Sequence, residues 1–177
     1  RQRQMCIRDS TRCNYSWDNW IMTEFTLLAG TNRINGLLVE HNHKSVLINV
    51  GSGFVHNGWH RVAPPDLNNI EGIFLTSSDE LDSGGLAELI KTKADLDVFL
   101  SEVAKKIVEQ KLKNVGLTAN LHIVNSKSHL QSNGIEVKFF ESSQTVAGSL
   151  GLQLSTADGS ICFVPNLQLP LISDQLN

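Results

Sequence analysis

Residues 72–89 read Gly72-Ile-Phe-Leu-Thr-Ser-Ser-Asp-Glu-Leu-Asp-Ser-Gly-Gly-Leu-Ala-Glu-Leu89. The first five residues are almost entirely apolar, which is typical of a strand buried on both faces of a sheet. A polar stretch over residues 77–83 follows, and the apolar residues from Gly84 to Ile90 then predict a short helix. In open α/β sheets, ligands bind beyond the carboxyl ends of the strands, in the loops that lead to helices. The sequence therefore predicts a site in the loop after Thr76.

Further strands are predicted on the N-terminal side of this stretch. Phe25–Ala29 is a short apolar run. Gly36-Leu-Leu-Val-Glu40 and Ser45-Val-Leu-Ile-Asn-Val50 are β-rich runs joined by the polar residues His41-Asn-His-Lys44, a pattern typical of a hairpin. Gly51-Ser-Gly53 ends the pattern, and we expect an irregular loop from there through Pro64-Pro65.

The C-terminal side continues with a strand and a helix. Asp97-Val-Phe-Leu100 predicts a strand, and Ser101 is a suitable N-cap for the helix that follows. Glu102 lies in the first turn, where the helix dipole favours a negative charge. We expect Val103, Ile107 and Val108 to form the apolar face of this helix.

The remainder is predicted to be mostly β. Turns containing Asn133-Gly134 and Asp158-Gly159 are expected to separate the last three of four runs, which are Leu121–Val124, Ile135–Phe140, Leu150–Ser155 and Ser160–Val164. The whole order is strands first, then β-α-β-α, then hairpins. This mixed α/β (α+β) order predicts sheets covered by helices.

Composition and charge exclude several classes of protein. Of the 177 residues, 41% are hydrophobic and 19% charged, which is a globular mixture. No apolar run is long enough for a membrane span, and the polar start lacks the apolar middle of a signal peptide, so we expect a cytoplasmic protein. Residues 1–10 carry a charge of +2, so the remainder falls from −3 to −5 and gives no charge-based evidence for nucleic-acid binding. The cysteines lack the spacing of a disulfide framework or zinc knuckle; they are Cys6, Cys13 and Cys162.

The two ends of the chain do not continue the predicted fold. Residues 1–10 have neither helical nor strand periodicity and resemble a translated sequencing adapter, so we expect residues 1–21 to be a non-native leader. A genuine disordered N-terminus is the alternative. Residues 22–177 are expected to form one partial domain, truncated at its C-terminus, because Leu167–Asn177 contains no clear element.

The stretch after Thr76 resembles the signature of the metallo-β-lactamase superfamily, which is a strand, then T-H-x-H-x-D-H-x-G-G, then a helix. Thr76 and Gly84-Gly85 preserve the frame of this motif at unchanged spacing. The metal ligands of the motif are replaced, in order, by Ser77, Asp79, Leu81 and Asp82. The resemblance implies an αββα sandwich, of which this chain supplies the N-terminal part.

Three further motifs, in family order, make the chain similar to ribonuclease J proteins. The family has a strand ending in an aspartate and glycine, a histidine before I-P-D-S-L-G-L, and I-V-x-T-G-D-F with a metal-bridging aspartate. In this chain these read Leu47-Ile-Asn-Val-Gly51, Gln144-Thr-Val-Ala-Gly-Ser-Leu-Gly-Leu152 and Ile161-Cys-Phe-Val-Pro-Asn-Leu167. The motif side chains are replaced by Asn49, Gln144 and Asn166, with Pro165 at the glycine. The similarity covers about residues 25–170 and is greatest to the degenerate second paralogue.

The family resemblance implies two zinc or manganese ions, which we expect to be lost here. A hydrolytic metal pair needs imidazoles and bridging carboxylates to hold the cations and to lower the pKa of bound water to about 7. The remaining candidate ligands are Asp79 and Asp82, which are weak remnants at most for a hard cation such as magnesium. Two carboxylates in a polar loop are usually solvated.

Two functional hypotheses follow from the resemblance. The first is a non-catalytic subunit of cytoplasmic RNA decay and processing, which pairs with an active ribonuclease J paralogue or with a second copy and meets RNA through the full-length protein. The second is a metal-dependent hydrolase of RNA or a small molecule that uses unusual ligands. A decaying gene or gene fragment is a third interpretation. No membrane partner is expected.

Other polar residues are interpreted as structural. His41 and His43 are expected in a solvated turn, His56 and His60 in a loop, and His122 and His129 are isolated in the sequence. Ser77-Ser78 has no histidine nearby in sequence to act as a base, so serine catalysis has no motif support. The tryptophans are too scattered for a base-stacking platform; they are Trp17, Trp20 and Trp59.

Overall fold

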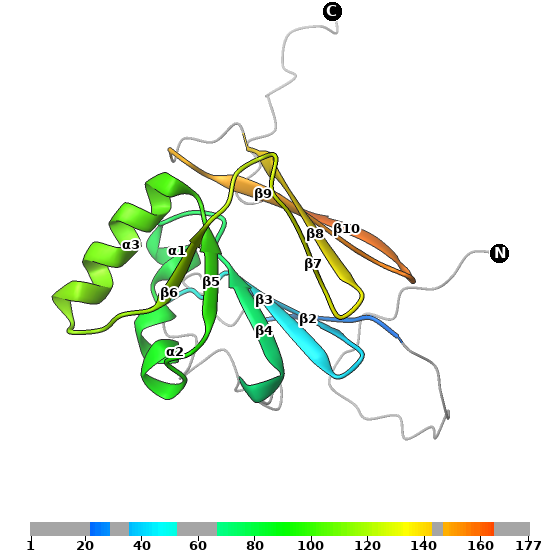
Figure 1. The fold of residues 1–177 in the computed structure, drawn as a ribbon, viewed down its shortest axis with the longest axis horizontal. Helices are drawn as coiled ribbons and strands as arrows, with labels where there is room; N and C mark the ends of the chain where they lie inside the picture. Colours follow the sequence, from blue (N-terminus) through cyan, green and yellow to red (C-terminus); the bar gives the residue numbers. More distant parts are fainter. Residues whose placement is uncertain (1–21, 29–35, 53–66, 143–146, 165–177) are drawn as a thin grey trace, which may run out of the picture.

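The computed structural model describes residues 22–28, 36–52, 67–142 and 147–164, without the side chain of Leu81. In these residues two sheets lie face to face, and three helices cover the outer face of the first sheet (Figure 1). The expected leader at residues 1–21, most of the expected loop at 51–65 and the segment 165–177 lie outside this description.

The first sheet is mixed and has the strand order β1-β2-β3-β4-β5-β6. The pairs β1·β2 and β2·β3 are antiparallel, whereas β3 to β6 run parallel. The strands are Glu24–Leu27, Leu37–His41, Lys44–Ile48, Ile70–Phe74, Asp97–Leu100 and Asn120–Ile123. The predicted hairpin is confirmed as β2–β3: its two turn residues, Asn42 and His43, have φ angles of 52° and 60°, as in the turns that match the strand twist.

Parallel strands need crossover connections, which the helices supply. Helices α1 (Glu80–Ser83) and α2 (Leu86–Thr92) connect β4 to β5, and a 3₁₀ turn, Leu67–Asn69, precedes β4. Residues 77–83, expected to be a polar loop, contain one helical turn.

Helix α3 (Glu102–Asn114) connects β5 to β6 and begins as predicted, with the Ser101 hydroxyl accepting from the Ala104 amide. The predicted apolar face is wrong in part. Val103 and Ile107 are 43% and 42% exposed, whereas Ala104, Val108 and Leu112 are buried. These three buried residues are four apart, so they lie on one face of α3, and this face packs in the core shared with the first sheet.

The second sheet is antiparallel, with the order β10-β9-β8-β7. Its strands are β7 (His129–Ser132), β8 (Ile135–Glu141), β9 (Leu150–Thr156) and β10 (Gly159–Phe163). Strand β7 was not predicted, because three of its four residues are exposed and only Leu130 packs inward. The Asn133-Gly134 turn therefore joins β7 to β8, not two of the later strands.

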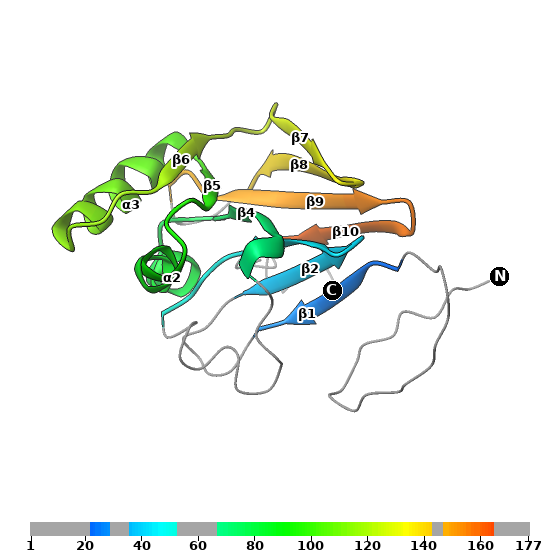
Figure 2. The same ribbon diagram turned by 60° about the horizontal axis from the view of Figure 1, so that its bottom comes forward.

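Two cores hold the layers together, and the alternation of side chains along each strand divides residues between them. Leu38 and Leu47 point toward the helices, whereas Leu37, Val46 and Phe74 point toward the second sheet. Phe74 contacts Phe139 across the sheets, with ring centroids 5.9 Å apart. Figure 2 shows the resulting stack of helices, first sheet and second sheet. The described residues thus form three of the four layers of an αββα sandwich.

In the described part of the chain, no helix has the length and apolar character needed to cross a membrane.

Candidate functional site at the strand ends

The loops after β3 and β4 meet at the carboxyl edge of the first sheet, where the sequence predicted a site. The two strands are parallel neighbours, and the Asn49 amide continues their pairing by donating to the Phe74 carbonyl at 2.9 Å. Asn49 follows β3 directly, and Thr76 lies two residues beyond β4. Both are fully buried.

Asn49 organises the site through its backbone and its side chain. Its φ of 59° lies in the left-handed region, which asparagine adopts more readily than most residues. Oδ1 accepts from the Thr76 backbone amide at 2.9 Å. Nδ2 donates to Oγ1 of Thr76 at 2.9 Å and to Oδ1 of Asp82 at 3.1 Å.

Asp82 lies on α1 with its carboxylate turned inward to the same point. Its Oδ2 accepts from the Ser77 hydroxyl at 2.6 Å and lies 3.2 Å from Oγ1 of Thr76. The Thr76 hydroxyl also lies 3.0 Å from Oδ1 of Asn49, and its single proton serves one of these acceptors at a time. Asp82 is 1% exposed, so the expectation of a solvated carboxylate is wrong for this residue.

We call Asn49, Thr76, Ser77 and Asp82 the strand-end network. Backbone hydrogen bonds surround it. The Val50 amide donates to the Asp82 carbonyl at 2.7 Å, and the Gly85 amide donates to the Val50 carbonyl at 2.8 Å. From the second sheet, the Leu150 amide donates to the Thr76 carbonyl at 2.9 Å. Backbone hydrogen bonds from the loop after β3 and from the second sheet thus fix the conformation of the loop after β4.

Asp79, the other candidate remnant, has a helix-capping role. Its Oδ1 accepts from the Glu80 amide at 2.7 Å, and its own amide donates to the Ser77 hydroxyl at 3.1 Å. The carbonyl of Asp79 accepts from the Ser83 hydroxyl at 2.8 Å. Asp79 therefore stabilises the first turn of α1.

Two glycines preserve the frame of the family motif, and at one of them the structure shows why no larger residue fits. A Cβ at Gly84 would lie 2.6 Å from the Glu80 carbonyl oxygen, closer than real Cβ atoms approach. The tight turn between α1 and α2 therefore requires glycine at residue 84 whether or not a metal is bound.

The structure brings Ser77 and Asp82 together with two other positions of the family motifs, Asn49 and Thr76. Asp79 is adjacent but faces its own helix. Gln144, Pro165 and Asn166 lie outside the described residues, as does the side chain of Leu81. The sequence identified these positions through the family motif, but it gave no signal that four of them bond to one another.

The donor set of the strand-end network does not fit a zinc or manganese pair. It offers one carboxylate, one amide and two hydroxyls, without an imidazole. Across the described ranges, no group of three or more histidine, cysteine, aspartate or glutamate residues is arranged to hold a metal. One negative charge cannot balance two divalent cations held a few ångströms apart.

Three histidines have partners that the sequence did not indicate. His41 is 3% exposed, and its Nδ1 lies 3.0 Å from the Thr23 hydroxyl, so a solvated turn is correct only for His43. His122 lies 2.8 Å from the Asp97 carboxylate and stacks on Phe99, and His129 lies 2.7 Å from Glu136. His56 and His60 lie outside the described residues, as do the tryptophans.

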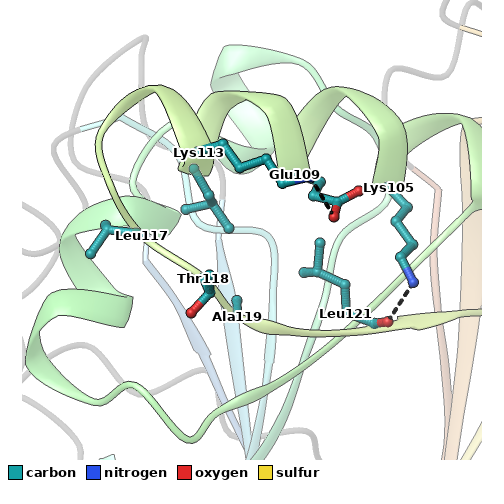
Figure 3. A pocket seen from close by; sticks show the side chains of 8 residues that line it. Lys105, Glu109, Lys113, Leu117, Thr118, Ala119 and Leu121 are labelled. Carbon is teal, nitrogen blue, oxygen red and sulfur yellow. Dashed lines mark hydrogen bonds and ion pairs between the residues drawn. The ribbon is translucent and has the colours of Figure 1, made fainter.

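A separate pocket of about 270 Å³ lies between α3 and β6 and shares no residue with the strand-end network (Figure 3). Its apolar side includes Leu117 and Leu121. Its charged side chains are already paired, because Lys105 donates to the Leu121 carbonyl at 3.0 Å and Lys113 lies 3.0 Å from Glu109. The charged side chains of this pocket are therefore engaged with one another or with the backbone.

Comparison with known proteins places this geometry in a fold class. No protein-family model matches the chain. The metallo-β-lactamase with a HARLDQ motif from Cronobacter sakazakii superimposes with a TM-score of 0.62 at 14% identity, over 76% of this chain and 54% of that one. The metallo-β-lactamase BJP-1 of Bradyrhizobium japonicum gives 0.63 at 14% identity, over 82% and 61%. The short form of human tRNase Z gives 0.62 at 13% identity, over 81% and 68%. The chain has the metallo-β-lactamase fold.

Sequence comparison finds similarity to one curated protein over part of the chain. Over 96 residues, 53% of this chain, the sequence is 27% identical to ribonuclease J 2 of Staphylococcus saprophyticus. The match spans 17% of the length of that protein. The chain thus has the metallo-β-lactamase fold and a partial, distant sequence similarity to ribonuclease J 2.

Proposed function

We propose that this chain is a non-catalytic, ribonuclease J-like subunit that acts in cytoplasmic RNA decay and processing beside an active ribonuclease J paralogue. The observation that carries the proposal is the strand-end network. At the positions where the family motif has metal ligands, Asp82 accepts hydrogen bonds from Ser77 and Asn49.

The chemistry of these residues supports the proposal. Hydrolysis in a metallo-β-lactamase-type site needs cations that activate a bound water. The Ser77 hydroxyl and the Asn49 amide are donors directed at a carboxylate, and both are buried. The described network contains no histidine, and its one carboxylate, Asp82, is buried and accepts hydrogen bonds from Ser77 and Asn49. These contacts stabilise the strand ends.

The catalytic half of the proposal is tested with purified protein and metal. We expect single-stranded and structured RNA to remain intact in Mn²⁺ or Zn²⁺, and the metal content after gel filtration to be far below one ion per chain. An active ribonuclease J under the same conditions is the positive control. Stoichiometric metal together with cleavage that Asp79→Ala and Asp82→Ala both abolish would show the metal-dependent hydrolase instead.

The partner half needs a separate measurement. The tagged chain is mixed with the active paralogue of the same cell, and the mixture is analysed by size-exclusion chromatography with light scattering. A complex of fixed stoichiometry supports the proposal. Two separate peaks would exclude that partner, and a single species containing two copies of this chain would indicate a homo-oligomer.

A further inference from the structure

We infer that Asn49, Thr76 and Ser77 take the place of metal cations as the partners of the buried Asp82 carboxylate, so that the strand ends are held together without a divalent cation. This inference rests on the proposed function to the extent that both take the site as non-catalytic. It concerns stability, however, and its test is independent of RNA and of any partner.

The first support is the burial of the charge. A buried carboxylate is strongly unfavourable unless it is hydrogen-bonded or paired with a cation. Asp82 is 1% exposed, and donors reach both of its oxygens: Ser77 at 2.6 Å on Oδ2 and Asn49 at 3.1 Å on Oδ1. The bond from Ser77 has the short length typical of a hydroxyl that donates to a charged acceptor. Hydroxyl and amide donors thus reach both oxygens of the carboxylate.

The second support is the set of segments that the network joins. Asn49 follows β3, Thr76 and Ser77 follow β4, and Asp82 lies on α1. A cation with ligands from these segments would tie them to one another. Here the hydrogen bonds between side chains do so, reinforced by the bond from the Val50 amide to the Asp82 carbonyl.

The third support is that residue 49 is an asparagine. It can be replaced by aspartate, which has nearly the same shape. Asn49→Asp keeps a side chain that tolerates the left-handed backbone, and it keeps an oxygen to accept from the Thr76 amide. It replaces the amide that donates to Asp82 across 3.1 Å with a second carboxylate oxygen. Two buried carboxylates at this separation repel each other.

The experiment measures thermal unfolding at pH 8 in EDTA and in Mn²⁺. We expect the Tm of the wild-type chain to be the same in both within about 1 °C, and that of Asn49→Asp to fall by about 5 °C or more in EDTA. The double variant Asn49→Asp with Asp82→Asn exchanges the amide and the carboxylate across the same pair of positions. It should recover a large part of the lost Tm in EDTA, because one donor and one anion again face each other.

Two results would overturn the inference. One is a wild-type chain that retains stoichiometric metal through gel filtration and unfolds at a lower temperature in EDTA. The other is a double variant no more stable than Asn49→Asp. If Asn49→Asp does not fold, Ser77→Ala takes its place: an equal loss of Tm in EDTA and Mn²⁺ supports the inference, and a loss that Mn²⁺ reverses contradicts it. RNA cleavage by the wild type would refute the proposed function without deciding this question.

Discussion

Polar contacts stabilise both ends of the sandwich, but those at one end are buried and those at the other are partly exposed to solvent. At the carboxyl ends of β3 and β4, the strand-end network is buried and joins segments of the first sheet and α1. At the opposite end, Thr23 is the centre of a second cluster. Its hydroxyl lies 3.0 Å from Nδ1 of His41, 2.8 Å from the Thr156 hydroxyl and 2.9 Å from the Asp158 carboxylate.

The Thr23 cluster joins the first sheet to the β9–β10 turn, and solvent reaches part of it. Its bond from Thr23 to Asp158 is exposed, whereas the bonds of Asp82 in the strand-end network are buried. Water replaces a broken bond at an exposed site but not at a buried one, so the same lost hydroxyl costs more stability at the strand ends. The comparison therefore indicates that the strand-end network contributes more to stability than the Thr23 cluster.

The largest effect is expected from Ser77→Ala. It removes the 2.6 Å donor to a buried carboxylate, and hydrogen bonds to charged groups contribute about 2 kcal/mol to the free energy of unfolding. Denaturant unfolding measures the change. Ser78→Ala is the matched control, because Ser78 bonds through its backbone carbonyl, to Lys111 and Ser83. Equal effects of the two variants would show that the contact with Asp82 has no special weight.

A smaller effect is expected from Thr23→Val at the other end. The change keeps the side-chain shape and removes the hydroxyl that contacts His41, Thr156 and Asp158, for a loss of about 1 kcal/mol. Thr26→Val, on the strand β1 that follows Thr23, is the control. A loss as large as that of Ser77→Ala would contradict the distinction between the two ends.

The smallest effect concerns the ion pair between Lys44 and Glu71, 2.7 Å apart and partly exposed. Hydrogen bonds from Lys44 and then Ser132 hold the pKa of Glu71 below its ordinary value of 4.5. The folded state thus favours the ionised form, and this stabilisation is present above pH 4.5 and is lost as the pH falls through the lowered pKa. Glu71→Gln should lower the free energy of unfolding by less than about 1 kcal/mol at pH 7, and by less at pH 3 or in high salt.

Glu40→Gln is the control, because its effect on stability at pH 7 should have the opposite sign to that of Glu71→Gln. Burial, and then the charge of Glu24, raise the pKa of Glu40 above 4.5, so its contribution to stability is lost as the pH rises through the raised pKa. Glu40→Gln should therefore raise the Tm slightly at pH 7 and leave it unchanged at pH 3. A fall in Tm at pH 7 would show that the bond between Ser45 and Glu40 outweighs the burial.

Strands and helices with strong local signals could be predicted from the sequence. The hairpin over β2 and β3, the buried β4 and the Ser101 cap have patterns that depend on neighbouring residues alone. The wrong predictions concern residues whose burial depends on how distant segments pack together. Val103 and Ile107 are as apolar as buried residues, but the orientation of α3 on the sheet leaves them half exposed. His41 ends a strand next to the second sheet, so a polar residue near a turn became buried.

The sequence predicted a candidate site after β4, but it did not predict the contacts among the residues there. The frame from Thr76 to Gly85 indicated the position after β4, and the family comparison gave the replaced ligands. The expectation that Asp82 is solvated was wrong, because the local sequence of a polar loop does not show which side chain α1 turns inward. That orientation depends on Asn49, which is 33 residues away along the chain.

The sequence by itself determined the order of the strands and helices other than α1 and β7, the hydrophobic faces of the sheets and the residues at the ligand positions of the motif that it resembles. These properties follow from local periodicity and residue type. The tertiary structure alone decided that Asn49, Thr76 and Ser77 donate to one buried carboxylate, and that His41 bridges toward the second sheet. Such contacts require segments distant in the sequence to pack together, and burial then turns an ordinary hydrogen bond into one whose loss water cannot replace.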